Sequence, residues 1–105
     1  MKIKNYIDNI KSKYPNEKLF LVTKSETINE NIEDDKIVDG YWVIGSIPHE
    51  PTVGVSMTVL RYANSINPEG MCGITRTSEI KEIQNLKPSG KMVITTNSEY
   101  LVEEI

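Results

Sequence analysis

The chain contains few of the residues from which disulfides, zinc sites and catalytic triads are built. Its 105 residues include one cysteine, Cys72, and one histidine, His49. A single cysteine excludes an intramolecular disulfide framework and a zinc site made of several cysteines. The stretch from Asp35 onward places aliphatic residues where a calcium loop needs oxygen ligands, and it has no glutamate at the required distance. We therefore expect neither a metal site nor a cofactor.

Long apolar runs and glycine-rich phosphate loops are also missing. The longest apolar stretches, 19–22 and 41–44, have the length of strands, whereas a bilayer span needs about 20 residues. Residues 1–8 contain no apolar run like that of a signal peptide, so we expect a cytoplasmic protein without a membrane partner. No pattern of the G-x-G-x-x-G or G-x-x-x-x-G-K-[ST] type occurs, which excludes nucleotide hydrolysis by that route.

The charge is weakly acidic and unevenly distributed. The formal net charge is −3 and the isoelectric point is about 5.2, whereas a general nucleic-acid coat would carry the opposite balance. Residues 1–24 sum to +4, residues 25–50 to −6 and residues 51–105 to −1. The acidic middle is the most polarised part of the chain and would suit a protein partner with a basic surface.

An amphipathic helix is predicted for residues 2–14. Pro15 ends the pattern, because proline disfavours helical geometry in the residue before it. Apolar side chains recur at spacings of three and four, which places them on one stripe of a helix. The stripe consists of Ile3, Tyr6, Ile7, Ile10 and Tyr14.

The remainder, 18–105, has the composition and turn signals of short β-strands. Together with the helix, these strands predict one α+β domain over residues 1–105. We expect the helix to pack on a small, strongly bent antiparallel sheet of about five strands, or on an SH3-like partial barrel. The strand signals cover 18–23, 36–38, 40–46, 53–59, 73–83 and 91–102, with Asp39-Gly40 as a hairpin turn.

Two aromatic residues next to the acidic segment are candidate contacts for a protein partner. Because side chains alternate along a strand, one of Tyr41 and Trp42 is expected in the core and the other on the surface. An exposed aromatic side chain is typical of an interaction hot spot. The leading hypothesis is a small non-enzymatic binding or regulatory protein. Its expected contact residues are Glu26, Glu30, Glu33, Asp34, Asp35, Asp39, Tyr41 and Trp42.

By analogy with other isolated small domains, such a protein fits the role of a phage or mobile-element inhibitor of a host factor. The sequence is also compatible with a homodimer, in which an edge strand at 53–60 pairs with its copy across a two-fold axis.

The sequence is also compatible with two alternative functions. The first is a small β-barrel that binds a nucleotide or single-stranded nucleic acid through Arg61, Tyr62 and Arg76. The second is a small hydrolase in which His49 activates the Cys72 thiol. The residues around Cys72 match no cysteine-protease signature, so this side chain is expected instead to be a small buried apolar group.

Overall fold

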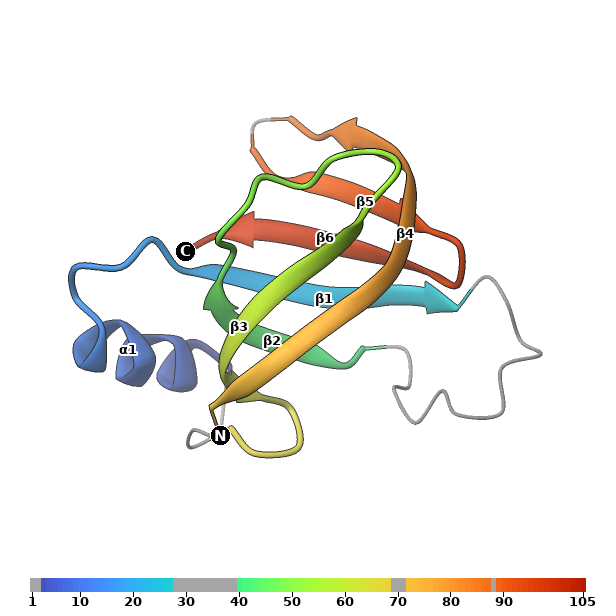
Figure 1. Cartoon of the computed structure of the whole chain (residues 1–105). Helices are drawn as coiled ribbons and strands as arrows, with labels where there is room; N and C mark the ends of the chain where they lie inside the picture. Colours follow the sequence, from blue (N-terminus) through green and yellow to red (C-terminus); the bar gives the residue numbers. More distant parts are fainter. Residues whose placement is uncertain (1–2, 28–39, 69–71, 88) are drawn as a thin grey trace.

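A closed antiparallel barrel with one helix on its outside is the architecture of the computed structural model, which describes residues 3–27, 40–68, 72–87 and 89–105. Each strand pairs with the next one in the chain, and β1 also pairs with β6, which closes the barrel (Figure 1). The elements are α1 (Ile3–Lys13), β1 (Phe20–Thr27), β2 (Trp42–Ser46), β3 (Ser56–Asn64), β4 (Gly73–Asn85), β5 (Lys91–Thr95) and β6 (Ser98–Glu104).

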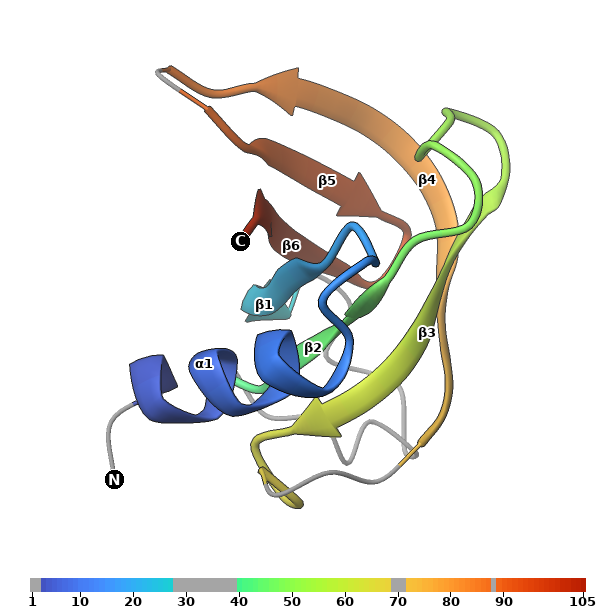
Figure 2. The same ribbon diagram turned by 90° about the vertical axis from the view of Figure 1, so that its left-hand side faces the viewer.

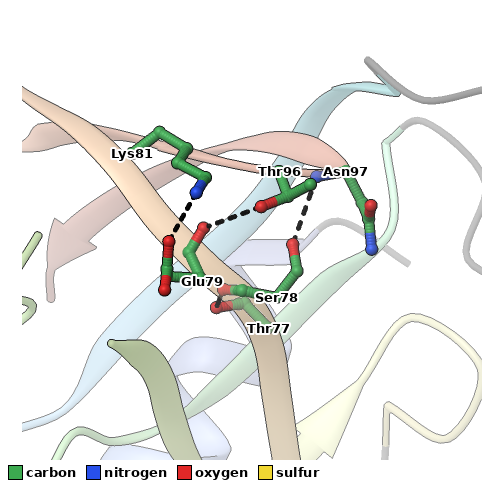
Figure 3. A network of polar contacts seen from close by, with 6 residues as sticks. All are labelled: Thr77, Ser78, Glu79, Lys81, Thr96 and Asn97. Atoms are coloured by element: carbon green, nitrogen blue, oxygen red, sulfur yellow. Dashed lines mark hydrogen bonds and ion pairs between the residues drawn. The ribbon is translucent and has the colours of Figure 1, made fainter. Parts of the chain in front are cut away.

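The α+β class, the helix and the barrel are confirmed, but the expectation of about five strands and partial closure is corrected to a closed barrel with six strands in the described part of the chain. The segment 91–102 was expected to be one strand and instead forms the hairpin β5–β6. Its turn is held against β4, as Figure 3 shows. The Thr96 N–H donates to the Glu79 carbonyl at 3.0 Å, and the Asn97 N–H donates to the Ser78 hydroxyl at 3.1 Å. These two bonds draw the chain into a turn where strand composition alone predicts continuation.

The helix packs on the outer face of β1, β2 and β3 (Figure 2). The described strands form a closed barrel, so they offer the helix no open sheet face to cover. Ile10, at the centre of the predicted apolar stripe, is 0% exposed and packs in a cluster with Leu19, Ile44 and Ala63. Because the helix covers this face, Val43 and Ile44 are both buried, one inside the barrel and one outside. A strand buried on both faces has a continuous apolar sequence, as found at 41–44.

Strand β4 bends in the middle and pairs with β3 along its first half and with β5 along its second half. At the bend, the Gly54 N–H donates to the Ile80 carbonyl and the Ile80 N–H donates to the Val55 carbonyl, both at 2.9 Å. The strand expected from residue 53 therefore begins only at Ser56. Val53 and Val55, which lie within the predicted strand, are 56% and 55% exposed in the turn that precedes β3.

The segment 53–60, expected as the edge strand of a homodimer, is part of the barrel wall. From Ser56 onward it pairs with β4, and Leu60 also pairs with Ser46 of β2. A dimer formed through this strand would compete with pairings inside the barrel.

The barrel interior is apolar, with several polar side chains among the buried residues. The apolar interior cluster consists of Val22, Tyr41, Val43, Met57, Val59, Ile80, Val93 and Val102. The buried polar residues are Lys24, Asn64, Thr77, Thr95 and Ser98.

Candidate binding site at the barrel mouth

The end of the barrel where β1 begins and β6 ends contains an open pocket of about 520 Å³. This end faces the viewer in Figure 2. The mouth pocket, as we call it, draws its walls from β1, β5, β6 and the segment that follows β2. It is lined by Lys18, Phe20, Ile47, Glu50, Pro51, Ser89, Gly90, Lys91, Val102 and Glu104.

The floor of the mouth pocket is continuous with the interior core. Val102 belongs to the apolar interior cluster, and Phe20 and Ile47 pack against it. These side chains point inward because Phe20 and Val22 occupy the same face of β1, while Leu21 between them packs with the helix. An apolar group placed in this pocket would therefore leave water and contact the core of the barrel.

The rim of the mouth pocket carries two ion pairs. Lys18 Nζ lies 3.3 Å from Glu104 Oε1, and Lys91 Nζ lies 3.1 Å from Glu50 Oε1. The Lys18 ammonium also lies over the Phe20 ring, 5.7 Å from its centroid. Ion pairs exposed to water contribute little to stability, so a ligand can exchange them for its own contacts at small cost.

One wall of the mouth pocket leads to an exposed apolar turn. Ile47, Glu50 and Pro51 form this wall, and Val53 and Val55 follow with more than half of their surface exposed. The Thr52 hydroxyl donates to the Glu50 carbonyl at 3.0 Å, and the bonds from Gly54 and Val55 to β4 hold the far end of the turn. The turn is thus held at both ends while its valines face solvent.

The acidic contact surface expected from the sequence falls mostly outside the described residues. Glu26 is exposed on β1, while the expected contacts at 30–39 lie outside the described part of the chain. Tyr41 is 8% exposed, and its hydroxyl accepts a hydrogen bond from Asn64 Nδ2 at 3.1 Å. Trp42 is half-buried against Tyr6, with ring centroids 5.9 Å apart. The structure therefore places Tyr41 inside the barrel and Trp42 half-buried under the helix, whereas the sequence predicted one of the two on the surface.

The residues of the nucleic-acid alternative do not share a surface. Arg61 donates from Nη1 to the Thr75 hydroxyl at 3.2 Å and lies against Gly73, on the face of β4 that also carries the buried Thr77. Arg76 is exposed and lies between these positions, so it points to the opposite face of β4. Tyr62 packs with the helix: its ring stacks on Tyr14 at 4.1 Å between centroids.

The two residues of the hydrolase alternative also lie in different parts of the molecule. Cys72 is exposed, which corrects the expectation that it is buried, and its sulfur lies 3.9 Å from the Tyr14 hydroxyl. His49 is exposed in the segment 47–55. Figures 1 and 2 both place that segment at the opposite end of β3 from the start of β4, which Cys72 precedes.

The pKa values of two stacked tyrosines at the end of the helix, Tyr14 and Tyr62, are raised above their ordinary value. The hydrogen bond that Tyr62 donates to the Glu17 carboxylate raises the pKa of Tyr62 above 10.0, because ionisation would place two negative charges together. The contact with Cys72 raises the pKa of Tyr14. Because the pKa is higher in the folded state, each protonated tyrosine stabilises the folded protein. This contribution is complete below about pH 10 and is lost as the pH rises through the folded-state pKa.

We therefore expect the phenolate absorbance of Tyr62 to develop at higher pH than that of a free tyrosine. In Glu17→Gln the titration of Tyr62 should move back toward the ordinary value, because the neighbouring charge is gone. The difference between the spectra of the unmodified protein and Tyr62→Phe identifies the absorbance that belongs to Tyr62. An unchanged titration in Glu17→Gln would mean that the carboxylate does not contact the phenol in solution.

The fold and the mouth pocket define a class: a small closed antiparallel barrel with one helix on its outer face and an open pocket at one end. Comparison of the chain with models of known families, with curated proteins and with solved structures found no match. Within the described residues, no group of three or more histidine, cysteine or acidic side chains is placed to hold a metal ion. In the same part of the chain, no helix is long and apolar enough to cross a membrane.

Proposed function

We propose that this protein is a non-enzymatic binding protein that recognises another polypeptide at the barrel mouth. The observation that carries the proposal is the mouth pocket, with an apolar floor that opens to solvent and a charged rim. Hot spots of protein interfaces combine an apolar anchor in a pocket with surrounding contacts that exclude water. Val53 and Val55 would extend such an interface, because apolar groups exposed beside a pocket mark interaction surfaces.

A polypeptide suits the mouth pocket better than a small molecule does. Sites for small molecules bury most of the ligand surface in a largely enclosed cavity. The mouth pocket is open on one side, and four of its lining side chains are charged and paired with one another across its rim. A side chain inserted from a larger partner leaves the open side covered by the partner itself.

The regulatory role expected from the acidic segment, including inhibition of a host factor, stays a prediction. Its partner with a basic surface would contact Glu26 and its acidic neighbours in the sequence rather than the mouth pocket. The nucleic-acid alternative is less favoured, because the Arg61 side chain of β3 contacts one face of β4 while Arg76 lies on the opposite face.

Filling the mouth pocket is expected to abolish recognition. Ser89 lines the pocket and is exposed, so Ser89→Trp should occupy the space without disturbing the core. The full chain is immobilised and screened against random peptide display libraries, and the selected peptides are then bound to the variant. We expect their affinity for Ser89→Trp to fall at least about tenfold, as loss of a hot-spot contact does.

The matched control is Lys87→Trp, which adds the same side chain to the same β4–β5 connection but outside the lining residues. It should bind the selected peptides like the unmodified protein. Circular dichroism of both variants verifies the fold. The proposal fails if no peptide is selected, or if the selected peptides bind Ser89→Trp and the unmodified protein equally well.

A further inference from the structure

The two ion pairs on the rim of the mouth pocket differ in how firmly their members are held. The Lys91 side chain is 33% exposed, whereas that of its partner Glu50 is 81% exposed. The lysine stem therefore lies in the pocket wall, and the carboxylate reaches it from solvent. The Lys18 and Glu104 side chains are 69% and 59% exposed, so that both members of this second pair are largely in water.

This asymmetry gives the mouth pocket a preference for one sign of charge. A ligand carboxylate that replaces Glu50 gains a positioned ammonium, while Glu50 returns to water with little loss, since it is already mostly hydrated. A ligand ammonium would instead have to take Glu50 or Glu104 from its lysine, and it would have to order a carboxylate side chain that is 81% or 59% exposed. The Lys18 ammonium lies above the Phe20 ring, but Glu104 already neutralises it, so the preference rests on Lys91.

The apolar floor and the Lys91 ammonium line the same pocket, so a single ligand can reach both. The required ligand carries an apolar side chain with a carboxylate close to it. In a polypeptide this carboxylate belongs either to an aspartate or glutamate next to the apolar residue, or to the free carboxyl terminus.

We propose that the mouth pocket binds a partner segment that pairs an apolar side chain with a carboxylate, and that Lys91 holds this carboxylate in place of Glu50. This inference rests on the proposed function, because it names the chemistry of the polypeptide that the pocket recognises. The apolar side chain occupies the floor formed by Phe20, Ile47 and Val102. Glu50 acts as an exchangeable counter-ion that keeps Lys91 neutralised when the pocket is free.

The test uses peptides selected on the unmodified full chain from two display libraries, one with free carboxyl termini and one with internal peptides. We expect the selected sequences to contain an apolar residue next to an acidic residue or at the terminus. Lys91→Gln should weaken their binding about tenfold or more, because a charge-assisted contact is lost. Lys91→Arg should restore most of it, and Glu50→Gln should strengthen binding about two- to threefold by freeing Lys91.

Synthetic peptides distinguish the two sources of the carboxylate. Amidation of the terminus removes binding if the terminus is recognised, and replacement of the acidic residue by its amide removes it if the side chain is recognised. Two outcomes would overturn this inference and leave the proposed function standing. In the first, Ser89→Trp weakens peptide binding but Lys91→Gln does not. In the second, the selected peptides are enriched in lysine and arginine. If no selected peptide is sensitive to Ser89→Trp, the proposed function and this inference both fail.

Discussion

Replacement of Gly45 by alanine is expected to destabilise the barrel strongly by forcing β2 and β3 apart. Gly45 lies in β2, and a Cβ atom at this position would meet the Leu60 carbonyl oxygen of β3 at 2.0 Å. Neither backbone can yield without breaking the β2–β3 pairing, where the register already shifts between Ile44 and Gly45. We expect a loss of at least about 3 kcal/mol in the free energy of unfolding, a large share of the stability of a small domain. Urea denaturation followed by the fluorescence of Trp42 measures it.

Gly54→Ala is the matched control for this substitution. No atom lies within 4 Å of a Cβ at position 54, but the backbone has φ +97°, which L residues adopt at a cost. The expected loss is about 1 kcal/mol, from backbone strain alone. If Gly45→Ala cost no more than Gly54→Ala, the close approach of β2 and β3 would be absent in solution.

Truncation of Ile10 is expected to be the most damaging change in the helix. Ile10 is the buried residue of α1, at 0% exposure, and it packs with Leu19, Ile44 and Ala63 on the outside of the barrel. Ile10→Ala should lower the free energy of unfolding by about 2–4 kcal/mol through lost burial and the cavity left behind. Denaturation followed by far-ultraviolet circular dichroism measures the change. Emission from Trp42 should shift to longer wavelength if the helix separates first, since its ring contacts Tyr6.

Ile3→Ala provides the comparison, because it makes the same chemical change on the same helix. Ile3 is 36% exposed, and we expect its truncation to cost about 0.5 kcal/mol or less. Equal costs for the two variants would show that the helix does not dock through Ile10.

The helix and the strand-rich body could be predicted from the sequence because both depend on local periodicity. The apolar stripe that includes Ile10 depends only on residues three or four positions apart. The alternation of side chains in β1 depends only on adjacent residues. Closure of the barrel depends on pairing between residues such as Val22 and Val102, which no local pattern records. The final hairpin escaped prediction for a related reason, since its turn is held by Glu79 and Ser78 of another strand.

The mouth pocket could not be predicted at all. Its charged residues Lys18, Glu50, Lys91 and Glu104 come from four separate parts of the sequence and form no motif. The acidic segment and the aromatics near it are prominent in the sequence because these residues are concentrated there. The aromatic residues are explained by packing instead: Tyr41 fills the interior and Trp42 supports the helix.

The pairing of the first strand with the last has a kinetic consequence. At a synthesis rate of about 5–20 residues per second, roughly 4–15 seconds pass between the synthesis of β1 and that of β6. During this time, the edge of β1 that later pairs with β6 is unpaired. An unpaired strand edge is a template for other chains, and proteins counter this by placing a charged residue on the inward face. Lys24 occupies such a position in β1 and is 1% exposed after closure. Before closure its ammonium would be hydrated, so another chain that packed over that face would have to bury a charge.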